Sequence, residues 1–138
     1  MARPERNNVD YFPFLCKEGK AMFYIEKKYG NDGYATWIKI LRELAITNFH
    51  FLDLSNNIQL MFLASKCNVT EAILIDVIND LCELEEFDKH LWSIKVVYSH
   101  KFIDSIQDAY KKRNNECITY EGVIRIISGA QPENKAKK

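Results

Sequence analysis

Residues 56–84 read NNIQLMFLASKCNVTEAILIDVINDLCEL, and this stretch holds two helical patterns separated by a short turn at residues 67–69. Ser55 and Thr70 stand where the N-caps of the two helices would be. Two helices joined in this way are typical of a helix-turn-helix, whose second helix lies in the major groove of DNA. The stretch therefore predicts a helix-turn-helix at the centre of the fold.

The second of these helices is unusual for a DNA-reading element, because every charged residue in it is acidic. Residues 70–88, TEAILIDVINDLCELEEFD, hold seven Asp or Glu and no Lys or Arg. Reading base edges needs Arg, Lys, Asn or Gln on the exposed face, and phosphates repel carboxylates. The apolar residues cover roughly 200° of the helix, wider than the roughly 100° stripe of a surface helix. The favoured interpretation is a core helix with a solvated acidic face. The second interpretation is that the additional apolar residues contact another protein, and DNA reading is the least favoured of the three.

The sequence on either side predicts further helices and a small sheet. Pro4 and Pro13 disfavour helix in residues 1–16, which are expected to form an extended arm. Amphipathic spacing and turn residues predict helices over 18–29, 33–47, 56–66, 71–84 and 100–113, and strands over 49–53, 86–88 and 94–98. In the third of these helices the residues expected to face the core are Ile58, Leu60, Met61, Leu63 and Ala64.

The C-terminal segment, residues 114–138, is open to two interpretations. The pattern CITYEGVIRII fits a hairpin that turns at residues 121–122, and it also fits a helix that begins at Thr119. The last nine residues, AQPENKAKK, are polar and are expected to form a disordered tail or the start of a linker.

This order of elements predicts a mainly α fold with a small antiparallel β-sheet. It is the order of a winged helix-turn-helix with extra N-terminal and C-terminal helices, in which residues 86–98 form the wing. The expected organisation is an extended arm over residues 1–16, a winged-helix domain over 17–113, and a C-terminal extension with a polar tail over 114–138.

Composition favours a globular cytoplasmic protein. The chain has 138 residues, of which 47% are hydrophobic, and its 19 basic and 19 acidic residues give a net charge of zero. A neutral chain is a poor candidate for coating nucleic acid indiscriminately. Its four cysteines form no C-x-x-C pair, so they are expected to be reduced. The N-terminus lacks the apolar segment of a signal peptide, and no apolar run is long enough to span a membrane.

Three stretches of the chain resemble a known family. They are RPERNNVDYFPF (residues 3–14), YGNDGYATWIKILREL (29–44) and EFDKHLWSIKVVYSHKFIDSIQDAYKKR (86–113). These stretches resemble the N-terminal domain of phage replisome organisers, which is related to the N-terminal winged helix of the primosome protein DnaD. The resemblance covers residues 3–113 and implies a cytosolic helper of replication initiation.

In DnaD the N-terminal domain is associated with self-assembly, and a separate C-terminal domain carries much of the DNA binding. The 138 residues leave no room for a second domain after residue 113, so the chain resembles the assembly module alone. The resemblance therefore implies a homo-oligomer that has replication proteins, such as a helicase or its loader, as partners.

Two sets of residues are candidates for contacts. Exposed cations near the arm, the wing and the end of the last predicted helix would bind phosphates weakly and without sequence preference; they are Arg3, Arg6, Lys89, Lys95, Lys101, Lys111, Lys112 and Arg113. An ordinary solvated surface is the preferred interpretation of these cations. Apolar residues of the arm and of two helices are candidates for an oligomer or partner interface; they are Tyr11, Phe12, Phe14, Leu74, Ile75, Ile78, Phe102 and Ile106.

No pattern in the sequence points to catalysis, a cofactor or a metal. His50, His90 and His100 lack the spacing of metal ligands, and no nucleophile motif or phosphate-binding loop is present. The chain is therefore expected to be a non-enzymatic interaction and assembly module without a cofactor. The alternative is a DNA-binding winged helix that contacts phosphates through its wing, its helix end and its arm.

Overall fold

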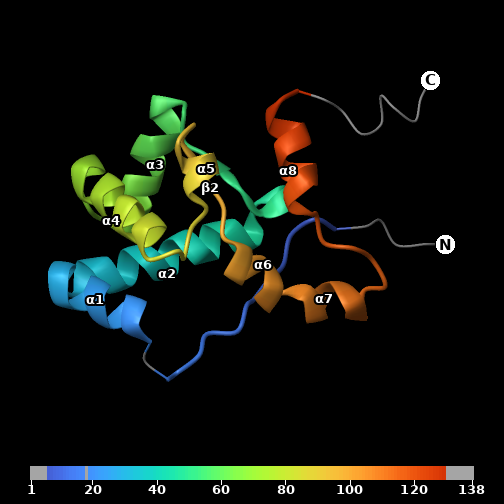
Figure 1. Cartoon of the computed structure of the whole chain (residues 1–138), viewed down its shortest axis with the longest axis horizontal. Coiled ribbons are helices and arrows are strands. Elements are labelled where there is room, and N and C mark those ends of the chain that lie inside the picture. The colour runs from blue at the N-terminus through green and yellow to red at the C-terminus, as the bar shows by residue number, and fades with distance from the viewer. Residues whose placement is uncertain (1–5, 18, 130–138) are drawn as a thin grey trace.

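The structure is a computed structural model that describes residues 6–17 and 19–129 (Figure 1). Helix α2 runs through the middle of the molecule and contacts α1, α3 and α4. In chain order the elements are α1 (Lys20–Tyr29), α2 (Asn31–Ile46), the 3₁₀ turn η1 (Asn48–His50), β1 (Leu52–Asp53), α3 (Asn57–Cys67), α4 (Glu71–Glu83), α5 (Lys89–Trp92), β2 (Val96–Val97), α6 (His100–Ser105), α7 (Gln107–Lys112) and α8 (Tyr120–Ile127).

The predicted helix-turn-helix is present as α3 and α4. The Thr70 hydroxyl accepts a hydrogen bond of 3.1 Å from a first-turn amide of α4, as the sequence predicts. The cap of α3 is Asn56 rather than Ser55, whose hydroxyl instead donates to the carboxylate of Asp53. Between the helices, Asn68 takes a left-handed conformation with φ 60°, which ends α3 sharply.

Helices α1 and α2 form an antiparallel pair because a glycine lets them approach closely. Gly30, at φ 68°, is both the C-cap of α1 and the N-cap of α2, so the second helix begins two residues before the start at residue 33 that the sequence predicts. A Cβ atom on Gly33 would lie 2.6 Å from the Cβ of Tyr29 and 2.9 Å from the carbonyl oxygen of Ile25. Only glycine fits this contact between the two helices.

The predicted wing hairpin is wrong in part. The sheet pairs β1 with β2 antiparallel, with Leu52 opposite Val97, and residues 86–88 form no strand. The Asp88 amide makes one backbone bond to Tyr98, and its carboxylate caps the short helix α5 by accepting from the amide of Leu91 at 2.9 Å. The N-terminal half of the predicted 49–53 strand is also wrong, because that segment forms η1.

The predicted helix over 100–113 is broken at Ile106 into α6 and α7. Two side chains take carbonyls that a continuous helix would use for its own backbone bonds. The Ser105 hydroxyl donates to Phe102 O at 2.7 Å, and the Gln107 amide donates to Ile103 O at 3.0 Å. Such local side-chain bonds compete with the backbone ladder and bend helices.

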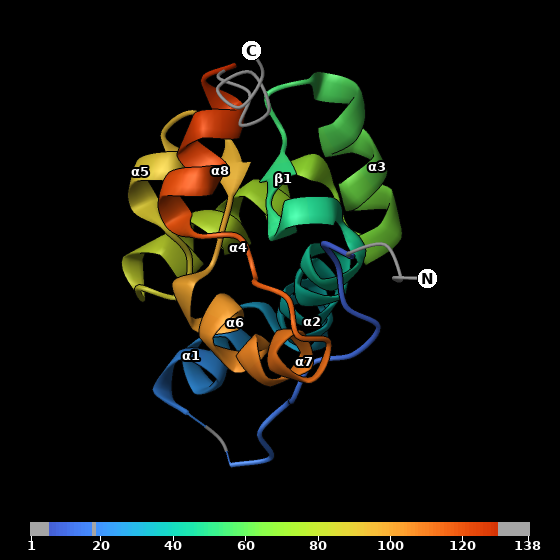
Figure 2. The same cartoon turned by 90° about the vertical axis from the view of Figure 1, so that its right-hand side faces the viewer.

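The C-terminal segment forms a helix, which decides between the two interpretations of the sequence. The Thr119 hydroxyl caps α8 by accepting from the amide of Gly122 at 3.0 Å. Figure 2 shows α6 and α7 below α8, and the first residue of α8, Tyr120, packs on the rings of Tyr98 and His100. Val123 is fully buried there. The predicted polar tail lies outside the described residues.

The described part of the chain is a mainly helical, winged-helix-like fold with a small two-stranded sheet, as the sequence predicts. The core extends from Val9 in the arm to Val123 in α8. Among the described residues, no helix is both long and apolar enough to cross a membrane.

Candidate interaction surfaces

The apolar face of α4 is covered by the rest of the chain. Leu74 and Ile78 are completely buried, and α4 contacts α1, α2, α3 and α5. Phe102 and Ile106, in and beside α6, are also buried. The prediction that these four residues belong to an interface is therefore wrong, because each contributes to the core. Ile75 is half-buried.

The polar residues of α4 hold neighbouring helices in place. Asp80 accepts hydrogen bonds from Lys28 at 2.8 Å and from the Tyr29 hydroxyl at 2.5 Å, both from the end of α1. Partial burial alone would raise the pKa of Asp80, but these two bonds hold it below the ordinary value. Asn79 accepts from the indole of Trp92 in α5 at 2.6 Å. One side of the predicted recognition helix is thus used for internal packing.

Most of the predicted phosphate-binding cations already have partners. Arg6 pairs with Asp10, Lys89 with Glu83, and Lys101 with Glu86. Arg113 is half-buried and bonded to the arm, while Lys95 lies over the ring of Trp92 at 4.7 Å. Three of the predicted cations are exposed and form no ion pair within residues 6–17 and 19–129: Lys95, Lys111 and Lys112. Arg3 lies outside the described residues.

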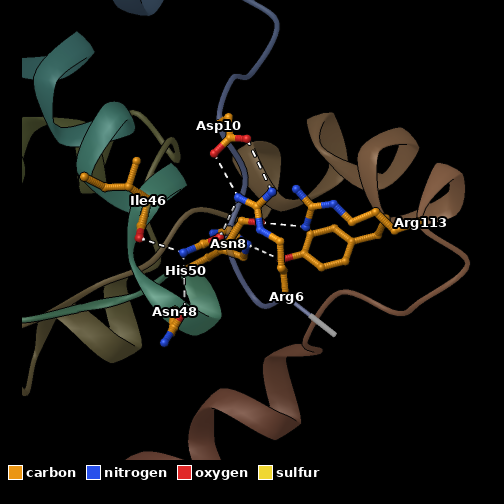
Figure 3. A network of polar contacts seen from close by, with 8 residues as sticks. Arg6, Asn8, Asp10, Ile46, Asn48, His50 and Arg113 are labelled. Atoms are coloured by element: carbon orange, nitrogen blue, oxygen red, sulfur yellow. Dashed lines mark hydrogen bonds and ion pairs between the residues drawn. The ribbon is translucent and has the colours of Figure 1, made fainter. Parts of the chain in front are cut away.

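The start of the arm is held on its own domain by hydrogen bonds of residues 7–9 that we call the arm clasp, and Figure 3 shows the part of it around Asn8 and Arg113. The Val9 amide donates to Ala45 O at 2.8 Å, and the Phe49 amide donates to Asn7 O at 2.9 Å. On the other side, the Arg113 guanidinium donates to Asn8 O at 2.6 Å. The arm is thereby held between the end of α2 and the end of α7.

A buried histidine and tyrosine lie beneath the clasp. His50 Nδ1 lies 2.7 Å from the carbonyl oxygen of Leu44, and His50 Nε2 lies 2.6 Å from the Tyr110 hydroxyl. Because a carbonyl can only accept, Nδ1 carries the hydrogen and Nε2 accepts from Tyr110. Burial lowers the pKa of His50; the nearby Arg113 charge adds to this effect, and the Leu44 bond opposes it. Burial also raises the pKa of Tyr110 to about 12.

The clasp was not predictable from the sequence. His50 lies in an aromatic run that reads as a strand, but Phe49 and His50 have φ of 67° and 57°. These left-handed conformations turn the His50 ring into the core, and nothing in the sequence indicates them. Among the described residues, no group of three or more His, Cys, Asp or Glu side chains could hold a metal ion.

Farther along, the arm arches over an apolar hollow. Phe12 is half-buried with its ring 5.5 Å from Phe102, and Phe14 contacts Tyr34 edge-on at 6.3 Å. Tyr11 is 67% exposed. The hollow has a volume of about 900 Å³ and is lined mainly by Met22, Trp37, Ile38, Leu41 and Leu84, together with the arm. Of the predicted interface residues, Tyr11 and Phe14 remain accessible.

Helix α3 carries a second accessible apolar surface, which the sequence reading missed. Ile58, Met61 and Phe62 are 57%, 47% and 61% exposed. The prediction that Ile58 and Met61 face the core is wrong, because Leu63, Ala64 and Cys67 take that position. The signal was present: α3 has apolar residues around its whole circumference, and its sole charged residue is Lys66. We call Ile58, Met61 and Phe62, with Ser65, the α3 face.

Comparison with known proteins places the chain in a family. A family model described as Lin1244/Lin1753-like, N-terminal, matches residues 11–102. Neither the curated proteins nor the solved structures contain a match. The matched residues run from the arm into α6 and so include the helix-turn-helix and the sheet. The chain belongs to the family of Lin1244/Lin1753-like N-terminal domains.

Proposed function

We propose that this protein is a non-catalytic interaction and self-assembly module that serves DNA replication initiation in the cytoplasm of a phage-infected or bacterial cell. The resemblance to replisome organisers and to the N-terminal domain of DnaD supports the replication role. It also supports a replicative helicase or its loader as a partner. The four cysteines, all free in the structure, agree with a reducing compartment.

The observation that carries the proposal is the exposed apolar surface on the arm and on α3. Tyr11, Phe14, Ile58, Met61 and Phe62 are each between 47% and 67% exposed. Isolated apolar residues are ordinary on a protein surface, but adjoining ones mark sites of protein contact.

The charge of α4 supports protein contact over DNA reading. Its exposed polar residues are Glu71, Asp76, Asn79 and Glu83, of which three are carboxylates. Asn79, the single amide among them, accepts the bond from Trp92. A helix with this surface would be repelled by phosphates if it approached the major groove.

Light scattering coupled to size-exclusion chromatography tests the proposal. We expect a mass that rises above that of one chain as the protein concentration increases through tens of micromolar. A strict monomer at every concentration up to about 500 μM would overturn the self-assembly part of the proposal. Co-purification with a candidate helicase or loader tests the partner separately.

Weak DNA binding is a second candidate function, favoured by the exposed cations Lys95, Lys111 and Lys112. Fluorescence anisotropy with duplex and single-stranded DNA at low and moderate salt tests this candidate. Binding through phosphates would weaken steeply with salt and would be lost in the variant with Lys111→Glu and Lys112→Glu. An absence of binding at low salt, or binding that the double variant leaves unchanged, would remove DNA from the proposal.

A further inference from the structure

The α3 face has the spacing of a helix–helix contact. Ile58, Met61, Phe62 and Ser65 occupy positions i, i+3, i+4 and i+7, so they form one stripe along the helix. All four residues are exposed, while the opposite side of α3 packs on α2 and α4. An apolar stripe of this kind is usually covered by a neighbouring helix, and here no described element of the chain covers it.

The charges around the α3 face favour a second copy of the same chain as its partner. On a two-fold axis each charge of an interface meets its own copy, so a self-associating face must avoid uncompensated charge. The stripe itself has none. Lys66, at its C-terminal end, is paired with Glu43 at 2.9 Å, and Asp53, before its N-terminal end, accepts from the hydroxyl and amide of Ser55. The same lack of free cations makes phosphates unsuitable partners.

The remaining parts of the 138 residues are poor candidates for covering the stripe. Residues 1–5 and 130–138, MARPE and AQPENKAKK, contain one large apolar residue, Met1. One large apolar side chain cannot fill an apolar stripe that spans two turns of a helix.

We propose that two copies associate through their α3 faces as antiparallel helices about a two-fold axis. The proposal rests on the self-assembly proposed above and assigns a surface to it. With the axis between residues 61 and 62, Met61 of each copy packs on Phe62 of the other, and Ile58 packs on Ser65. The antiparallel arrangement also places the two helix dipoles favourably.

The size of the face predicts a weak dimer. The three apolar side chains expose roughly 100 Å² each, or about 300 Å² per copy, against about 800 Å² per partner in a standard stable interface. Flanking polar residues enlarge the contact without reaching that size. Association is therefore expected at tens to hundreds of micromolar and depends on concentration.

A matched pair of substitutions tests the face. Phe62→Lys places a charge at its centre, and Phe23→Lys places the same charge on α1, at a side chain of nearly equal exposure, 61% against 56%. Since both side chains are exposed, neither change should alter folding, which circular dichroism can check. Sedimentation equilibrium from about 10 to about 500 μM should show a dissociation constant raised at least ten-fold by Phe62→Lys and unchanged by Phe23→Lys.

Disulfide cross-linking tests the geometry. In a Cys16→Ser background, which removes the exposed native thiol, Met61→Cys places a thiol beside the proposed axis. Facing Cα atoms of helices about 8–10 Å apart lie roughly 4–6 Å from each other, within the span of a disulfide. Oxidation should yield a covalent dimer with Met61→Cys and none with Asp76→Cys, at an exposed position of α4.

The outcomes separate this inference from the proposed function. If the Phe62→Lys variant dimerises as well as the wild-type protein, the α3 face is not the interface, although self-assembly still stands. The same conclusion follows if Asp76→Cys cross-links as readily as Met61→Cys. A wild-type protein that is monomeric up to about 500 μM overturns both. Dimerisation that Phe62→Lys abolishes and Phe23→Lys preserves supports both.

Discussion

Tyr110→Phe removes a single oxygen atom from a fully buried polar contact. Tyr110 and His50 are both 1% exposed, and their hydrogen bond of 2.6 Å joins α7 to η1. Without the hydroxyl, the Nε2 lone pair of His50 stays buried and has no donor. A buried acceptor left without a partner costs about 1–3 kcal/mol of folding stability. Against a total stability of roughly 5–15 kcal/mol, this loss is readily measured.

Urea unfolding measures the effect, with Tyr98→Phe as the matched control. Tyr98 is 2% exposed, and its hydroxyl forms no hydrogen bond within the described part of the chain. We expect Tyr110→Phe to lower the unfolding midpoint at an unchanged m-value, which indicates a loss of stability rather than a change in compactness. Tyr98→Phe should cost less than about 0.5 kcal/mol. Equal losses in the two variants would refute the assignment of stability to the His50–Tyr110 bond.

Three further predictions follow from the same packing. Gly33→Ala forces a Cβ atom to within 2.6 Å of Tyr29 and should destabilise the fold by about 1–3 kcal/mol in thermal or urea unfolding; an unchanged midpoint would contradict the close helix contact. Arg113→Met removes a bond to the arm, so the Val9 amide should exchange with deuterium faster while amides of α4 keep their rates. Because the pKa of His50 is lower in the folded chain than its ordinary 6.5, the unfolded chain binds the extra proton, and stability should fall as pH falls below about 6.5. That slope should shrink in His50→Leu, and an identical slope in the variant would exclude His50 as its source.

The helices were predictable where periodicity and caps agree. The sequence predicts α4 almost to the residue, because Thr70 provides a clear start and the apolar spacing is regular. The predicted 86–88 strand is wrong because Asp88 is the N-cap of α5, where its carboxylate accepts from the amide of Leu91. The order of elements in a winged helix favours a strand at this place, and this expectation outweighed the local sequence signal for a helix start. Breaks such as that at Ile106 depend on side chains that compete for backbone carbonyls, which periodicity does not register.

The surfaces were less predictable than the helices. Apolar residues on both sides of α3 give no unique inward face from sequence, so Ile58 and Met61 were assigned to the core. Ion pairing of the basic residues depends on contacts such as Lys101 with Glu86, which are distant along the chain. The number of cations is visible in the sequence, whereas the number left free is a property of the fold.

The arm clasp joins the two halves of the chain at a great separation in sequence. Arg113 bonds to Asn8 across 105 residues, and Asn115 bonds to the carbonyl of Arg6 across 109. Closing a loop of that length costs about 4 kcal/mol in chain entropy if nothing else is formed, so the contact is favourable only after the intervening helices have folded. During synthesis, Arg113 and Asn115 leave the ribosome more than 100 residues after the arm that they bind. A nascent or truncated chain that lacks residues 110–115 would keep the bonds of the arm to Ala45 and Phe49 but lose those to Arg113 and Asn115, so Tyr11, Phe12 and Phe14 would be held by one side of the clasp alone.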